Sequence, residues 1–100
     1  MALRRNVDFQ GKRVTVVGLA RSGIAACKVL AERGARVLAT DRSPRERLRG
    51  DLATLEARGV RIEAGVHRPE SFLEADLIVV SPGVPTELDL LGLALSLIHI

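Results

Sequence analysis

Glycine, serine and arginine occur together in the stretch GLARSG (residues 18–23), a combination suited to holding a phosphate group. The stretch follows a β-branched run, RVTVV (residues 13–17), and precedes apolar residues at helical spacing. A glycine turn between a strand and a helix aims backbone N–H groups and the positive end of the helix dipole at an anion. The pattern therefore predicts a phosphate-binding loop, although a tight turn without a ligand has the same composition.

Asp41 is a second candidate binding residue. It ends a predicted strand 18 residues after Gly23, where dinucleotide-binding proteins place the carboxylate that accepts hydrogen bonds from a ribose. Ala20 argues against binding of a dinucleotide. Its methyl group stands at the position of the second glycine of the G-x-G-x-x-G fingerprint, where the backbone approaches the pyrophosphate. The loop could serve a nicotinamide dinucleotide or a different phosphate ligand, and these residues alone leave both possibilities open.

The stretch SPGVP (residues 81–85) is a third candidate, because it follows the apolar strand pattern DLIVV. In a sheet of order 3-2-1-4, this loop lies beside the loop at residues 18–23, across the topological switch point. Ser81 and Gly83 would then line the same pocket. A simple surface turn would have the same composition.

The elements that must position these residues follow from hydrophobic periodicity. Strands are predicted at residues 13–18, 35–41, 60–64 and 76–80, with a helix at residues 22–33 and a short helical turn within 65–75. This order predicts an α/β Rossmann-like, doubly wound parallel sheet of four strands. The alternating pattern of the third strand indicates an edge position, and the continuous apolar pattern of the fourth indicates an interior one.

A further helix is predicted to begin at Ser43. Ser43 would be its N-cap, Pro44 its first residue and Glu46 the partner in a capping box, with Gly59 at its end. The arginines of this segment would then lie on a solvated helix face, interleaved with acidic residues. They are Arg42, Arg45, Arg47 and Arg49.

Residues 1–94 are expected to form one incomplete domain. The last residues, LSLIHI (95–100), have no turn, cap or formal charge before the end, and we predict that they are a non-native read-through tail. The alternative is a genuine apolar segment, which would be too short to span a bilayer.

Composition excludes several classes of function. The chain contains 13 Arg and 2 Lys, but its only aromatic residues are two Phe, so stacking on nucleic acid is not expected. A single cysteine, Cys27, allows no internal disulfide and fits a core position in a reducing compartment. The N-terminus lacks the apolar region of a signal peptide, so we expect a cytoplasmic protein without membrane contact. His67 is expected to be solvated or hydrogen-bonded.

Three stretches, GKRVTVVGLARSGIAA, ATDRSP and ADLIVVSPGVP, occur in this order along the chain. In order and spacing they resemble the N-terminal domain of the Mur ligase family, and within it the ligases that add D-glutamate to UDP-N-acetylmuramoyl-L-alanine in peptidoglycan synthesis. The resemblance covers about residues 10–86. Family members commonly have glycine at the position of Ala20, and the chain departs from the family there.

The resemblance implies that the loop holds the diphosphate of a UDP-sugar. Arg21 and Ser22 would contact the diphosphate, while Asp41, Arg42 and Ser43 would surround the uracil and ribose. The substrate-binding residues predicted in this way are Gly18, Ala20, Arg21, Ser22, Gly23, Asp41, Arg42, Ser43, Ser81 and Gly83.

The resemblance also implies ATP- and Mg²⁺-dependent chemistry, in which a substrate carboxylate is phosphorylated and the amine of D-glutamate attacks the acyl phosphate. The sequence contains no G-x-x-G-K-[ST] phosphate loop. We therefore assign no catalytic or metal-binding residue, place the ATP and Mg²⁺ sites outside this chain, and expect an inactive, monomeric fragment. The alternatives are an NAD(P)-binding module of a dehydrogenase and a nucleotide sensor.

Overall fold

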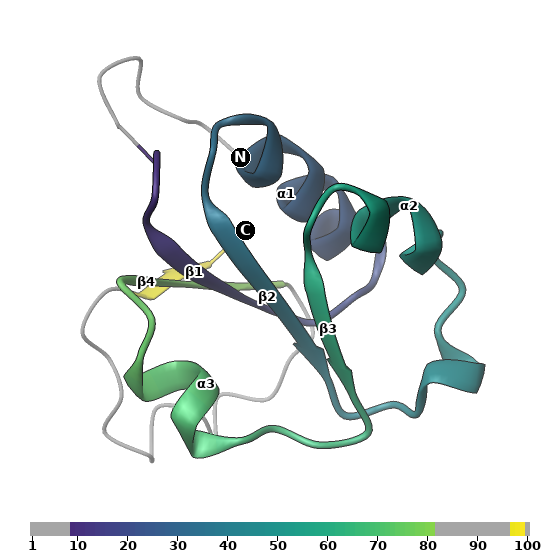
Figure 1. Cartoon of the computed structure of the whole chain (residues 1–100). Helices are drawn as coiled ribbons and strands as arrows, with labels where there is room; N and C mark the ends of the chain where they lie inside the picture. Colours follow the sequence, from purple (N-terminus) through teal and green to yellow (C-terminus); the bar gives the residue numbers. More distant parts are fainter. Residues whose placement is uncertain (1–8, 82–96, 100) are drawn as a thin grey trace.

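The computed structural model describes residues 9–81 and the backbone of residues 97–99. Its strands form one parallel sheet of order β3-β2-β1-β4-β5 (Figure 1). The elements in chain order are β1 (Arg13–Val17), α1 (Arg21–Glu32), β2 (Arg36–Asp41), the 3₁₀ turn η1 (Arg45–Arg47), α2 (Leu52–Ala57), β3 (Arg61–Ala64), α3 (Pro69–Leu73), β4 (Leu77–Val80) and β5 (Leu97–His99).

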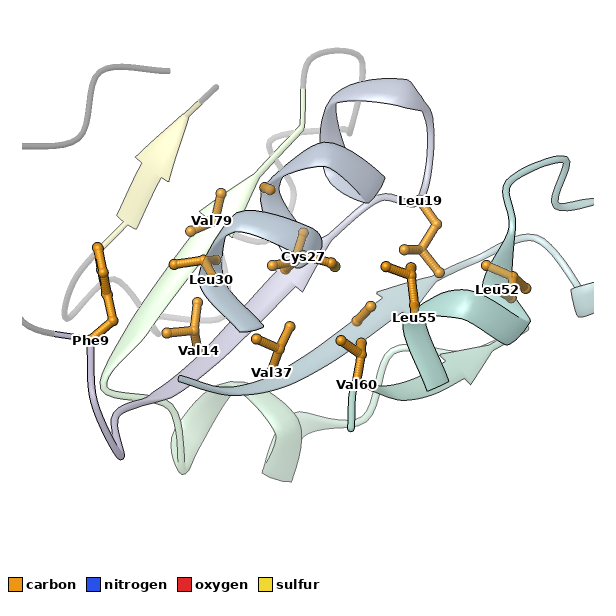
Figure 2. Packing of buried hydrophobic residues seen from close by; sticks show 13 residues of the cluster. Phe9, Val14, Leu19, Cys27, Leu30, Val37, Leu52, Leu55, Val60 and Val79 are labelled. Atoms are coloured by element: carbon orange, nitrogen blue, oxygen red, sulfur yellow. The ribbon is translucent and has the colours of Figure 1, made fainter. Parts of the chain in front are cut away.

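The helices cover both faces of the sheet. Alternate strand residues point to opposite faces, so Val14 and Val16 of β1 pack beneath α1 and α2, whereas Val17 packs with Phe72 of α3. Figure 2 shows the larger cluster, in which α1 and α2 close over the strands. Its buried members are Phe9, Val14, Val16, Leu19, Ala26, Cys27, Leu30, Val37, Ala39, Leu52, Leu55, Val60 and Val79.

The core position predicted for Cys27 is confirmed. Its side chain is fully buried, and burial raises the pKa of the thiol to about 12. The thiol is therefore protonated at neutral pH and behaves as a small apolar side chain.

In the part of the chain that the structure describes, no helix is long and apolar enough to cross a bilayer.

The predicted order 3-2-1-4 is confirmed, with β3 at an edge and β4 in the interior. The four predicted strands all form, and residues 97–99 add a fifth strand, β5, which pairs in parallel with β4. Residues 97–99 lie within the predicted read-through tail. Strand pairing does not test whether residues 95–100 are native, and that remains a prediction.

The prediction of a helix starting at Ser43 is wrong. Residues 45–47 form only the turn η1, the backbone at Leu48 is extended, and α2 begins at Leu52. The side chain of Asp51 caps α2 by accepting a hydrogen bond from the N–H of Thr54 at 3.1 Å. Gly50 would cost about 1 kcal/mol in a helix interior relative to alanine, whereas Asp is as good an N-cap as Ser. The sequence therefore contains two possible helix N-caps, Ser43 and Asp51, and the helix begins after Asp51.

This reassignment of the helix start can be tested by comparing Asp51→Ala with Ser43→Ala. The first change removes the cap of α2 and should lower the free energy of unfolding, whereas the second should leave α2 intact. The pKa of Asp51 is lowered by hydrogen bonds from Thr54, so its carboxylate stabilises the fold above its unfolded pKa. Urea unfolding should therefore show that the difference between wild type and Asp51→Ala shrinks as the pH falls through that lowered value. A larger loss for Ser43→Ala would contradict the assignment.

Candidate functional site

The glycine loop connects β1 to α1 at the carboxyl edge of the sheet. Gly18 adopts a φ of +96°, which side-chain-bearing residues rarely reach, and its N–H donates to the carbonyl of Thr40 at 2.8 Å. Ala20 is the N-cap residue of α1, and no side chain caps this end of the helix. The N–H groups of the first turn therefore face outward without a side-chain acceptor, an arrangement that favours an anion.

Gly23 allows α1 to pack directly on this loop. A Cβ atom at Gly23 would overlap the carbonyl oxygen of Gly18 and lie 2.9 Å from Oγ of Ser81. The same requirement explains the third glycine of dinucleotide-binding loops, which permits close packing of the helix on the strand. Gly23 therefore shapes the loop from a buried position.

A groove of about 740 Å³ opens beside the N-terminal half of α1, between this helix and residues 43–51. Among the predicted site residues, Ala20, Arg21, Asp41 and Ser43 line it. Its basic side chains are those of Arg21, Lys28, Arg47 and Arg49, and its acidic ones those of Asp41 and Asp51. The excess of positive charge makes the groove attractive to phosphate groups.

The helix predicted at two of these arginines is wrong, although both side chains are exposed as predicted. Arg47 lies in the turn η1 and the chain is not helical at Arg49, so the two residues line the groove rather than a helix face. Arg45 is the one whose side chain turns to the surface of α2, where it pairs with Glu56. Sequence reasoning also missed Lys28, although its position seven residues after Arg21 places both on one face of α1.

The carboxylate of Asp41 accepts hydrogen bonds from two backbone groups. Its Oδ2 lies 2.7 Å from the N of Leu19, and its Oδ1 lies 2.8 Å from the N of Ser43. The residue therefore connects the end of β2 to the glycine loop and to the start of the next loop. A carboxylate oxygen has two lone pairs, so these bonds leave acceptor capacity on both oxygens.

Ser81 lies at the end of β4 and is 3% exposed. Its N–H donates to the carbonyl of Val17 at 2.9 Å, and its hydroxyl donates to the carbonyl of Gly18 at 3.0 Å. The loop after β4 thus begins beside the glycine loop, as predicted, but the hydroxyl of Ser81 is directed at the backbone of that loop. Gly83 lies outside the described residues.

Two further predicted residues, Ser22 and Arg42, do not line this groove but are next in sequence to residues that do. Ser22 is exposed in the first turn of α1, and Arg42 is exposed next to Asp41. His67 comes from the loop after β3 and lies near Asp41 and Arg42. Burial and the positive charge of Arg42 lower the pKa of its imidazole, whereas the negative charge of Asp41 acts in the opposite direction. Its Nδ1 lies 2.8 Å from Oγ1 of Thr40, which confirms the expectation of a solvated or hydrogen-bonded imidazole.

A second groove, of about 500 Å³, lies at the amino ends of the strands. Its basic side chains are those of Arg13, Arg36, Arg58 and Arg61. The negative ends of the α1 and α2 dipoles point to this edge, because the helices run antiparallel to the strands. Arg13 and Arg58 also pair with Glu74 and Glu32. The carboxyl edge is therefore the better phosphate site.

Within residues 9–81, no cluster of His, Cys, Asp and Glu could hold a metal ion.

Comparison with known proteins decides the family. The sequence model of the family described as "Mur ligase MurD-like, N-terminal domain" matches residues 12–97. The chain belongs to the MurD-like Mur ligases. Proteins named UDP-N-acetylmuramoylalanine–D-glutamate ligase match this MurD-like domain closely. The one from Pelobacter propionicus is 48% identical over 88% of this chain and 20% of its own length, and the one from Anaeromyxobacter dehalogenans is 51% identical over 78% of this chain and 17% of its own length.

The chain thus spans about a fifth of the length of the curated relatives it matches. Among solved structures, a pseudomurein peptide ligase type C from Methanothermus fervidus has a TM-score of 0.72 at 21% identity, over 89% of this MurD-like chain and 19% of that one. The apo-structure of D-lactate dehydrogenase from Escherichia coli has a TM-score of 0.59 at 28% identity, over 81% and 23%. A ligase and a dehydrogenase therefore share this fold, so the fold alone does not assign the chain to either class. The match to the sequence model of the family makes the assignment.

The packing role of Gly23 gives a test of the loop geometry. Gly23→Ala should lower the free energy of unfolding by about 3 kcal/mol or more, because a backbone oxygen cannot move aside easily. Gly59→Ala is the matched control, because Gly59 has a φ of +90° but open space around its Cα. The control should cost about 1 kcal/mol from backbone strain alone. Equal losses in urea unfolding would contradict close packing at Gly23.

Proposed function

We propose that this MurD-like domain binds the UDP moiety of UDP-N-acetylmuramoyl-L-alanine. The observation that supports this most is the uncapped N-terminus of α1, which borders the groove with the excess of basic side chains. Backbone N–H groups of Arg21 and Ser22, with the hydroxyl of Ser22, would hold the diphosphate. Helix N-termini are well suited to this, because orphan N–H groups and the helix dipole act together.

The nucleoside would extend toward the ends of β2 and β4. Asp41, Arg42 and Ser43 follow β2, and Ser43 lines the groove beside Asp41. Gly83 belongs to the proposed pocket on the sequence argument alone. The cations at Arg47 and Arg49 also line the groove and would face the phosphates. The methyl group of Ala20 is compatible with this ligand, because a UDP diphosphate need not approach the loop as a dinucleotide does.

In the full-length protein we propose the reaction named for the relatives, the joining of D-glutamate to UDP-N-acetylmuramoyl-L-alanine in peptidoglycan synthesis. ATP would phosphorylate the substrate carboxylate with the help of Mg²⁺, and the amine of D-glutamate would displace the phosphate. The described residues bring together no catalytic arrangement, so these steps are assigned to other parts of the protein. We also propose a cytoplasmic monomer that contacts neither membrane nor nucleic acid.

The second candidate function is NAD(P) binding. Asp41 at the end of β2 and the 28% identity to a D-lactate dehydrogenase favour it. The two candidates predict different ligands for the same groove, so one titration separates them. UDP and NAD⁺ should each be titrated into the chain by calorimetry, and UDP alone should bind. Binding of NAD⁺ without UDP would overturn the proposed function.

The basic residues of the groove provide a matched pair of variants. Arg49→Ala should weaken UDP binding roughly 5-fold, because a solvated cation near a phosphate contributes about 1 kcal/mol. Arg45→Ala is the control, since Arg45 comes from the same segment but pairs with Glu56 on the surface. The difference should diminish at high salt, because exposed charges are screened. Equal affinities for the two variants would remove Arg49 from the site.

The reaction requires the full-length protein. Release of phosphate from ATP should depend on both UDP-N-acetylmuramoyl-L-alanine and D-glutamate, and should require Mg²⁺. Release with other amino acids but not with D-glutamate would keep the ligase class and refute the proposed substrate.

A further inference from the structure

One peptide plane in the glycine loop is fixed at both of its ends. The carbonyl of Gly18 and the N–H of Leu19 belong to the same planar unit and point in opposite directions. The carbonyl accepts the hydroxyl of Ser81 at 3.0 Å, and the N–H donates to Oδ2 of Asp41 at 2.7 Å. The two partners come from β4 and β2, which are the neighbours of β1 on either side.

Burial makes these bonds hard to replace. Leu19 is 2% exposed and Ser81 is 3% exposed. The bond of Ser81 is buried, whereas that of Asp41 is part-buried and borders the groove. Gly23 lies so near the carbonyl oxygen of Gly18 that no Cβ would fit between them, so there is little space on that side of the oxygen. An unsatisfied buried backbone group costs about 1–3 kcal/mol, so the native orientation of the plane depends on both side chains.

We propose that Asp41 and Ser81 are positioning residues of the phosphate-binding loop. They act by fixing the peptide between Gly18 and Leu19. This orientation sets the direction in which the chain enters α1, and therefore where the N–H groups of Arg21 and Ser22 point. The inference rests on the proposed UDP site and changes the role of two residues that the sequence pattern suggests as ligand contacts.

The second carboxylate oxygen of Asp41 also holds the backbone of the loop that follows β2. Oδ1 accepts the N–H of Ser43 at 2.8 Å, so one carboxylate holds both sides of the groove at a fixed separation. Asparagine has the same shape, but only one of its two terminal atoms accepts a hydrogen bond. In Asp41→Asn, either the N–H of Leu19 or that of Ser43 must therefore face an amide NH₂ group.

A positioning role and a contact role predict different ligand dependence. If Asp41 contacts the nucleoside, then Asp41→Asn weakens UDP binding and leaves inorganic pyrophosphate binding unchanged. If Asp41 positions the loop, the variant weakens both ligands by the same factor, which we expect to be about 10-fold. Ser81→Ala should behave in the same way. Calorimetric titration of both variants with UDP and with pyrophosphate distinguishes the roles, and a loss confined to UDP would overturn the proposal.

The double variant gives an independent result. The two side chains hold opposite ends of one rigid plane, so losing either one frees it. Asp41→Asn with Ser81→Ala should therefore bind little more weakly than either single variant, whereas independent contacts would give additive losses. Additive losses in affinity would refute action through a shared peptide plane.

The chain offers controls of the same chemistry elsewhere. Oδ2 of Asp76 accepts the N–H of Arg13 at 2.8 Å at the opposite edge of the sheet, and the hydroxyl of Ser71 donates to Glu63 at 2.6 Å. Asp76→Asn and Ser71→Ala should alter stability without changing the affinity for UDP or pyrophosphate. Should Ser81→Ala fail to fold, Ser81→Cys keeps a similar volume with a weaker donor and should lower affinity in the same direction.

Amide hydrogen exchange tests the positioning role of Asp41 and Ser81 without any ligand. Both Asp41→Asn and Ser81→Ala should speed exchange at the N–H of Leu19, which donates to Asp41 in the native loop, whereas the two control variants should not. If wild type binds neither UDP nor pyrophosphate, the proposed function fails, and this exchange pattern still decides the positioning role. Unchanged exchange at Leu19 in both variants would overturn it.

Discussion

The contact between α1 and the end of β1 is the constraint on which the rest of this structure depends. The helix starts so close to the sheet that only glycine fits at residue 23, and the turn before it needs the positive φ of Gly18. Moving α1 outward by one side chain would separate its apolar residues from Val14 and Val16, which lie in the main core. The same contact brings the start of the helix to the carboxyl edge of the sheet, so the packing of the core and the proposed phosphate site both depend on it.

Sequence reasoning succeeded where a single strong requirement determines the local structure. A strand, a glycine turn and a periodic helix can hardly combine in another way, and the apolar continuity of residues 77–80 requires burial on both faces. It failed at residues 43–51, where two helix start signals compete. The outcome there depends on Ile24, which packs where a Cβ of Gly50 would lie, and on Asp41, which holds the N–H of Ser43. Neither long-range contact is visible in a local pattern.

The candidate site shows the same division. Residue types and spacing indicated which residues gather at the carboxyl edge, because parallel strands all end there. They did not indicate the direction of each side chain. Asp41 and Ser81 have the types expected of ligand contacts, yet their hydrogen bonds go to the backbone of the loop. Conversely, Arg47 and Arg49 reach the groove only because the chain is extended at Leu48. The fold alone does not identify the ligand, since a dehydrogenase shares it.

The bond between Ser81 and Gly18 closes a loop of 63 residues. The order of events during folding follows from this separation, because contacts between distant residues form at a high entropic cost and accumulate late. On a ribosome, β1, α1 and β2 can assemble before residue 81 has been synthesised, but the glycine loop then lacks its partner on β4. Under the proposed function, the loop could bind its ligand only once β4 has joined the sheet, so occupancy of this loop would report that β4 has paired with β1.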